Sequence, residues 1–132
     1  MQRGLSLIEL LIVVAVTSIL AAIAYPSYRE QLRLVARSEA VGLLHDAALR
    51  LARHHARTGQ YADNDHLVTP LPTGSRYYSL QALRERDGYR LLAVRLPHGL
   101  MVQDRCGDYS LDQAGSQGNP GAIGDTVDCW GG

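Results

Sequence analysis

The residue best placed to do chemistry near the start of the chain is Glu9, whose carboxylate borders a long apolar segment. No charged side chain follows it between Leu10 and Tyr28. As an α-helix, this run would be about 28 Å long, close to the hydrocarbon thickness of a bilayer. A carboxylate at that depth costs a few kcal/mol unless a cation pairs with it. The pattern therefore predicts a positively charged partner for Glu9.

A second interpretation of Glu9 is local. Ser6 and Glu9 have the spacing of a capping box, in which each side chain accepts a hydrogen bond from the other residue's N–H. The dipole at a helix N-terminus also favours a nearby carboxylate. The two roles can hold at once.

The two cysteines, Cys106 and Cys129, lie near the C-terminus. Arg3 stands on the short N-terminal side of the apolar segment, which predicts that this end stays in the cytoplasm and that the remainder lies outside it. In an oxidising periplasm the cysteines are expected to form a disulfide. It would close a loop of about two dozen residues and contribute about 3.5 kcal/mol. The alternative is a pair of free thiols.

Other groups that could carry catalysis or bind metals show no functional spacing. The histidines lack the paired spacing of zinc ligands and are expected on a solvated helix surface. Aspartates near the cysteines lack the twelve-residue calcium-loop pattern. There is no nucleophile elbow or phosphate loop, so we expect no enzyme activity, no metal and no cofactor. These residues are His45, His54, His55, His66 and His98, and Asp104, Asp108, Asp112, Asp125 and Asp128.

Arginines and tyrosines in the second half of the chain could form a basic and aromatic strip of the kind that binds nucleic acid. Acidic Glu85, Asp87 and Asp104 lie among them, and the whole chain has 13 basic and 13 acidic residues. We therefore favour a solvated sheet edge and do not expect nucleic acid as a partner. The strip would consist of Arg84, Arg86, Arg90, Arg95 and Arg105 with Tyr77, Tyr78 and Tyr89.

A long helix must position Glu9. Pro26 removes one helical hydrogen bond and crowds the carbonyl of Ala22, so it should kink this helix without ending it. Beyond it, an apolar stripe is expected to pack on a sheet, with polar residues elsewhere on the helix. Thr58-Gly59 supplies the stop, so the helix is expected to end near Arg57. The stripe is Leu32, Val35, Ala36, Ala40, Leu43, Leu44, Ala47, Leu51 and Ala52.

The rest of the chain predicts a small antiparallel sheet of three or four strands. Residues 60–75 are expected to form a surface connection. Asp87-Gly88 is a hairpin turn signal between the first two strands. The glycine-rich tail from 114 to 132 is expected to lack regular structure and to be held by the cysteine bridge. The strands are predicted at 77–83, 89–96 and 108–112.

The run Gly4-Leu5-Ser6-Leu7-Ile8-Glu9, followed by an apolar helix and Pro26, resembles the N-terminus of a type IV prepilin. The layout of Cys106-Gly107, a short strand and Asp128-Cys129-Trp130 resembles the C-terminal end of PilE-like minor pilins. The resemblance implies an α+β pilin fold. Its parts would be a leader at 1–4, an N-terminal helix at 5–57 with 5–28 as transmembrane segment and filament core, and a globular head at 58–132.

The resemblance also implies roles for single residues. A prepilin peptidase would cleave after Gly4, Leu5 would become the N-methylated first residue, and Glu9 would act in assembly together with Pro26. The new α-amine would then neutralise a Glu9 carboxylate on an adjacent subunit. Leu5 replaces the phenylalanine most often found there, and Ser18 stands where major pilins often carry glycine.

The function implied is that of a minor pilin in pilus assembly, adhesion and twitching motility. Its partners would be other major and minor pilins, the prepilin peptidase and an inner-membrane assembly platform. The chain would cross the inner membrane once, with its N-terminus cytoplasmic and its head periplasmic, before it enters a cell-surface pilus. Two alternatives stay open, a type II secretion pseudopilin and a DNA-binding competence pilin.

Overall fold

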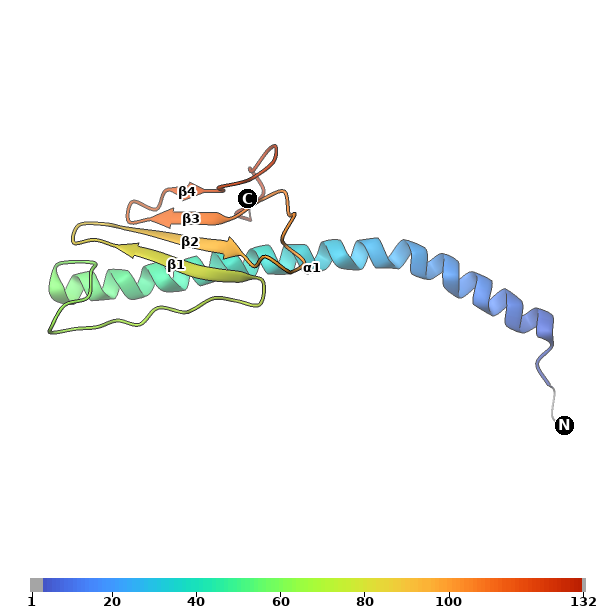
Figure 1. Ribbon diagram of the computed structural model, residues 1–132. Coiled ribbons are helices and arrows are strands. Elements are labelled where there is room, and N and C mark those ends of the chain that lie inside the picture. The colour runs from blue at the N-terminus through green and yellow to red at the C-terminus, as the bar shows by residue number, and fades with distance from the viewer. Residues whose placement is uncertain (1–3, 132) are drawn as a thin grey trace. The chain divides into compact units, whose positions relative to one another are not determined.

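The computed structural model describes residues 4–131. The chain divides into two compact units, Met1–Leu32 and Arg33–Gly132. One helix, α1 (Leu7–Thr58), belongs in its first part to the first unit and in its last part to the second. Figure 1 shows the order of the elements along the chain.

The first unit is the beginning of α1 and the residues before it. Every residue from 4 to 31 is exposed, and the segment is long and apolar enough, by length and composition, to cross a membrane. The helix runs through Pro26 without ending, as predicted. The described part of this unit therefore has an exposed apolar surface.

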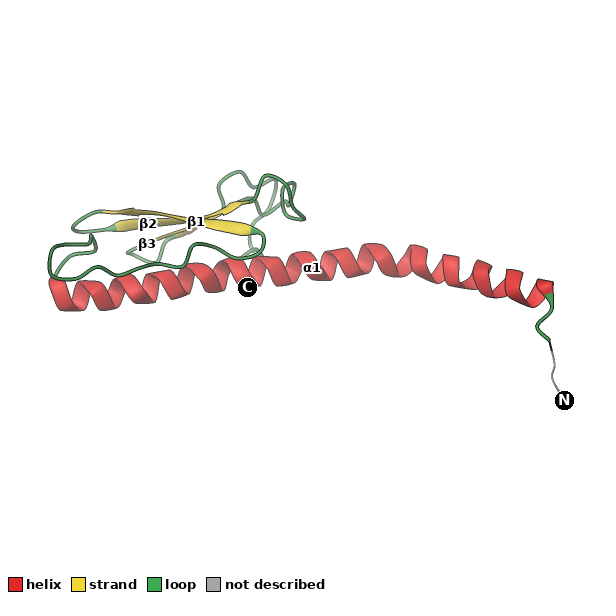
Figure 2. Cartoon of the chain, turned by 60° about the horizontal axis from the view of Figure 1, so that its bottom comes forward, coloured by secondary structure: helices red, strands yellow, loops and turns green. Residues whose placement is uncertain are grey.

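The second unit packs the last part of α1 against a four-stranded antiparallel sheet in the order β1-β2-β3-β4. Figure 2 shows the sheet along one side of this part of the helix. The predicted α+β architecture, a long helix packed on a small antiparallel sheet, is therefore confirmed. The strands are β1 (Tyr78–Arg84), β2 (Tyr89–Arg95), β3 (Tyr109–Asp112) and β4 (Gln117–Gly118).

The short strand β4 corrects the expectation that the tail has no regular structure. Gly115 adopts a φ of 78°, which lets the chain reverse directly after β3. Gly118 then lies opposite Ser110 in the ladder, where a Cβ atom would be 2.5 Å from the serine hydroxyl oxygen. The glycines of the tail argued against a strand in the sequence, but Gly115 and Gly118 are the residues that permit β4.

The core lies between α1 and the sheet. Its helical side consists of five fully buried residues at the centre of the predicted stripe, whereas Val35 and Ala52 are exposed. Two polar residues expected on the solvated side, Arg37 and His54, are buried instead. His54 follows Leu51 by three positions, so it continues the buried face of the helix. The five core residues are Ala36, Ala40, Leu44, Ala47 and Leu51.

The helix ends and the strands begin close to the predicted positions. The last helical residue is Thr58, and Gly59 follows it with a φ of 77°, the left-handed conformation common after a helix. The β1–β2 hairpin closes with Arg84 opposite Tyr89 and a hydrogen bond from the N–H of Glu85 to the carbonyl of Gly88. Residues 60–75 form the predicted connection on the surface of the second unit.

Candidate functional site

Ser6 and Glu9 form a hydrogen-bonded pair at the start of α1. The Ser6 N–H donates to Oε2 of Glu9 at 3.2 Å, and the Glu9 N–H donates to the Ser6 hydroxyl at 3.2 Å. This is the capping box that the spacing allows. Gly4 precedes it in open space, since a Cβ there would meet no atom within 4 Å. Arg3 lies outside the described residues.

Glu9 has no cationic partner within the part of the chain that the structure describes. Its carboxylate is exposed, and within residues 4–131 it accepts a hydrogen bond only from the Ser6 backbone N–H. A capping hydrogen bond satisfies one carboxylate oxygen and leaves the negative charge without a counterion. Any positive group that pairs with Glu9 therefore lies outside residues 4–131.

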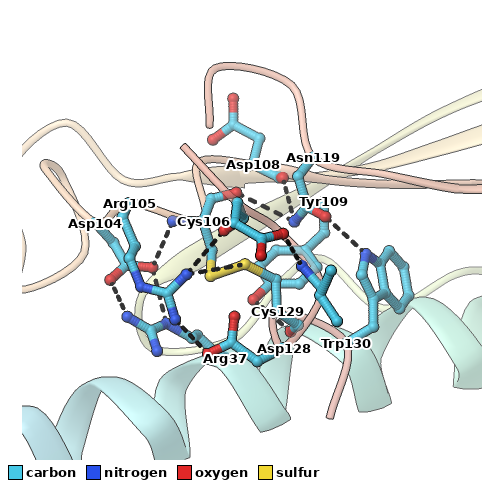
Figure 3. Close-up of a disulfide and its surroundings, with 12 residues drawn as sticks. Arg37, Asp104, Arg105, Cys106, Asp108, Tyr109, Asn119, Asp128, Cys129 and Trp130 are labelled. Carbon is cyan, nitrogen blue, oxygen red and sulfur yellow. Dashed lines mark hydrogen bonds and ion pairs between the residues drawn. A yellow bond between two sulfur atoms is a disulfide. The ribbon is translucent and has the colours of Figure 1, made fainter. Parts of the chain in front are cut away.

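The cysteine bridge lies over the middle of the second unit. Cys106 and Cys129 are joined with an S–S distance of 2.07 Å, and both are buried. Figure 3 shows the bridge between α1 and the end of the chain. The Tyr109 hydroxyl donates to the Cys129 carbonyl at 2.9 Å, and burial raises the pKa of that hydroxyl to about 12. The bridge and this hydrogen bond hold the tail against the sheet.

A buried ion pair connects the bridge to the helix. Arg37 donates from Nη2 to Oδ1 of Asp104 at 2.6 Å and from Nε to Oδ2 at 3.0 Å (Figure 3). The same Oδ2 accepts a hydrogen bond from the Cys106 N–H at 3.3 Å. Sequence reasoning missed this pair, although Arg37 stands next to Ala36 at the edge of the apolar stripe.

Three of the five aspartates near the cysteines form ion pairs with arginines. Asp104, Asp108 and Asp128 pair with Arg37, Arg95 and Arg105 respectively. The hydrogen bond from Arg105 holds the pKa of Asp128 below its usual value. Within residues 4–131 the structure brings no three histidine, cysteine or acidic side chains into an arrangement that could hold a metal ion.

The basic and aromatic strip, the alternative to the favoured solvated sheet edge, is not assembled. Three of its arginines are tied to aspartates, Arg84 to Asp63 at 2.8 Å and two in the pairs just described. Tyr78 faces the core and is fully buried, and this burial raises the pKa of its hydroxyl. Arg86 and Arg90 remain exposed near the hairpin. The strip is therefore reduced to two of its five arginines.

A different basic surface lies at the end of the helix. A groove of about 580 Å³, called the α1 groove below, runs between the last turns of α1 and residues 67–70. Three arginines line it on the helical side, and their spacing of three and four residues puts them on one helix face. The sequence periodicity predicts that these helix positions are polar, but it does not predict that residues 67–70 lie opposite them. The arginines are Arg50, Arg53 and Arg57.

Comparison with known proteins defines the class. The family model described as "Type IV minor pilin ComP, DNA uptake sequence receptor" matches residues 26–110, and the "Prokaryotic N-terminal methylation motif" matches residues 1–25. The chain belongs to the type IV pilins. Within them it is a member of the minor-pilin family that the first model describes, and it is a pilus subunit, a structural protein.

Individual relatives support this class. The type IV major pilin protein PilE1 of Neisseria gonorrhoeae is 34% identical over 65 residues, which are 49% of this chain and 39% of that one. A fimbrial protein of Dichelobacter nodosus is 34% identical over 88 residues, 67% of this chain and 54% of that one. The chain thus covers less than two thirds of the length of these relatives.

A solved structure supports the fold. A type IV pilin from Shewanella oneidensis superposes with a TM-score of 0.52 at 28% identity, covering 73% of this chain and 94% of that one. The long helix packed on a small antiparallel sheet is therefore the arrangement of a known pilin.

Proposed function

We propose that this chain is a minor pilin that enters a type IV pilus and supports adhesion and twitching motility. The observation that carries the proposal is Glu9, an exposed carboxylate at the start of an exposed apolar helix with no cation from residues 4–131 beside it. In a filament core, such a carboxylate needs a counterion. A neighbouring subunit with a free N-terminus supplies one.

Processing would create that counterion. A prepilin peptidase cleaves after Gly4, residues 1–4 leave as a leader, and the α-amine of Leu5 becomes N-methylated while it stays cationic. The open surroundings of Gly4 and the match of residues 1–25 to a methylation motif support this step. The helix at 5–57 then carries Glu9 and Pro26 into the filament, and 58–132 forms the exposed head.

The topology follows from the same features. The chain crosses the inner membrane once, with the N-terminus in the cytoplasm and the head in the periplasm, until an assembly platform extracts it into the pilus. The apolar helix supports the crossing. The Cys106–Cys129 disulfide supports an oxidising location for the head.

Substitution of Glu9 tests the proposal. Glu9→Ala should leave cleavage intact and exclude the chain from sheared pili, because the amine of the neighbour loses its partner. Gly4→Ala should instead keep the leader attached, as seen by mass spectrometry of the membrane fraction. Pili that contain Glu9→Ala at wild-type levels, relative to the major pilin on the same blot, would refute the assembly role.

The secretion pseudopilin is not favoured by the comparisons, since the matched family and the relatives described above are pilins of fimbriae and pili. We propose DNA capture as a second candidate function. The description of the matched family, a DNA uptake sequence receptor, favours it. Binding of fluorescent duplex DNA by the full chain in uncharged detergent tests this candidate, and it fails if no duplex binds at about 50 mM salt, where phosphate contacts are strong.

A further inference from the structure

Two grooves of the second unit differ in the charge they offer to a phosphate. The groove beside the β1–β2 hairpin holds Arg90 together with Glu85 and Asp112. The α1 groove holds three arginines and one acid, Asp46, which already pairs with Arg50 at 3.3 Å. A phosphate therefore meets net negative charge at the hairpin and net positive charge at the end of the helix.

We propose that the α1 groove binds the phosphate backbone of double-stranded DNA through Arg50, Arg53 and Arg57. The inference rests on the DNA role proposed above and assigns that role to a surface other than the sheet. It places the contact on the last turns of α1 and on the facing segment 67–70.

The spacing of the arginines fits a duplex strand. Arg57 follows Arg50 by seven positions, so the Cα atoms of the three arginines span about 10.5 Å along the helix. One strand of duplex DNA carries a phosphate every ~3.4 Å along its axis, so this span covers about three phosphates. Guanidinium groups suit this contact because their planar donors can pair with two phosphate oxygens.

The arginines are available for a ligand. Arg53 and Arg57 are exposed and form no ion pair with any residue in the range 4–131. Arg50 is steadied at the groove wall, where its Nη1 donates to the Pro70 carbonyl at 3.2 Å. A phosphate that binds Arg53 or Arg57 therefore displaces no ion-pair partner from either side chain.

The facing wall is fixed by buried hydrogen bonds. The buried His54 ring contacts the Thr69 hydroxyl through Nδ1 at 2.8 Å and the Ala62 carbonyl through Nε2 at 2.9 Å. Arg84 also donates to the Thr69 carbonyl at 3.1 Å. The groove is thus formed before a ligand arrives, which lowers the ordering cost of binding.

Hydrogen bonds at the C-terminal end of α1 weaken the repulsion between the helix dipole and an anion. The last carbonyls of a helix carry partial negative charge when they lack hydrogen bonds. Here the Thr58 hydroxyl donates to the His54 carbonyl at 2.9 Å, and the Gly59 N–H donates to the His55 carbonyl at 2.8 Å. These two bonds reduce the partial negative charge that the helix end presents to an anion in the groove.

Salt dependence of DNA binding tests the assignment, because each neutralised phosphate contributes about 0.9 to the slope of log affinity against log salt. Three contacts predict that affinity for a fluorescent duplex falls about 40-fold between about 50 and 200 mM salt. Arg53→Gln or Arg57→Gln should each reduce this loss to about 12-fold, whereas Arg57→Lys should keep it. The full chain is used in uncharged detergent micelles.

Matched controls on the sheet are Arg86→Gln and Arg90→Gln, which should keep the wild-type slope. The assignment fails if both helix variants keep that slope, and a reduced slope in Arg90→Gln would move the contact to the hairpin. If the wild-type chain binds no duplex even at about 50 mM salt, the DNA role itself fails, and the assignment with it.

Discussion

Arg37 in α1 and Asp104 in the segment before β3 form a two-point ion pair between residues 67 positions apart, at 2.6 and 3.0 Å. Their side chains are only 8% and 2% exposed. Because Asp104 also accepts the N–H of Cys106, the pair links the helix to the disulfide-closed end of the chain. It is a buried polar contact between α1 and the segment that leads into β3.

Loss of Arg37 should therefore destabilise the head strongly. Arg37→Ala leaves a buried carboxylate without its counterion, which should cost about 4 kcal/mol. Urea denaturation followed by circular dichroism measures the change. Asp46→Ala, which breaks an exposed helical pair with Arg50, is the control and should cost about 0.5 kcal/mol or less. Equal effects of the two substitutions would contradict the distinction between the pairs.

Removal of the disulfide should lower the free energy of unfolding by about 3.5 kcal/mol, since the bridge closes a loop with a sequence separation of 23. The double variant Cys106→Ser/Cys129→Ser and the reduced wild-type chain should agree in denaturant melts. Emission from Trp130, which packs edge-on against Tyr109 at 5.2 Å between ring centroids, should shift to the red as the tail is released. An unchanged midpoint would show that other contacts hold the tail.

Two glycines separate backbone strain from steric clash. Gly107 and Gly115 have φ values of 67° and 78°, but only at Gly107 would a Cβ meet other atoms, at 2.5 Å from the Pro120 carbonyl oxygen and 2.7 Å from the Ala122 nitrogen. Gly115→Ala should cost about 1 kcal/mol for its left-handed backbone. Gly107→Ala should cost about 2 kcal/mol more, because the backbone must also shift. Thermal melts that rank the two variants the other way would contradict this account.

The capping box predicts a local effect of Ser6. Ser6→Ala removes the hydroxyl that accepts the Glu9 N–H, at a cost of about 1 kcal/mol to the first turn. Hydrogen exchange at the first turn in detergent micelles should become about fivefold faster, whereas Ser6→Thr should keep the wild-type rate. Unchanged exchange in the alanine variant would show that the box does not stabilise the helix start.

Acid should weaken the head through Asp63 and Asp128. Partial burial opposes the shift at Asp63, but hydrogen bonds from Thr69 and Arg84 bring the pKa of this carboxyl below its usual value. The Arg105 side chain lowers the pKa of Asp128 in the same direction. The folded state therefore binds fewer protons than the unfolded state around pH 3 to 4. The stability that these two carboxylates contribute is fully present above their pKa in the unfolded chain, and it is lost as the pH falls through their lower pKa in the folded chain.

Denaturant melts between about pH 2 and 6 check this sign. Asp63→Asn and Asp128→Asn should each flatten the acid limb, and Asp65→Asn, at an exposed neighbouring aspartate, is the control. A steeper acid limb in Asp63→Asn would contradict the assigned direction.

Much of the fold was predictable because local patterns decided it. Gly59 and the hairpin signal at Asp87-Gly88 mark boundaries that the structure reproduces within a residue or so. The disulfide followed from two cysteines and a membrane topology. The processing and assembly roles of Gly4, Leu5 and Glu9 stay predictions.

The sequence did not reveal contacts that depend on distant partners. Arg37 and His54 look like solvated helix residues until Asp104 and the segment 62–69 come to them. The aspartates that pair with arginines of the supposed strip also lie far along the chain, since Arg84 meets Asp63 across 21 positions and Arg105 meets Asp128 across 23. Pairings of this kind are tertiary, so charge counting along the chain cannot find them.

The order of the chain has a consequence for when the head can fold. The buried face of α1 is made early in synthesis, but everything that covers it, including β2, β3 and Cys129, lies C-terminal to it. Because such long-range contacts form only after the intervening chain is available, the head cannot fold segment by segment as it emerges. Folding of the head therefore waits until Cys129 is available, and a closed Cys106–Cys129 disulfide marks a head in which the chain up to that residue has been made.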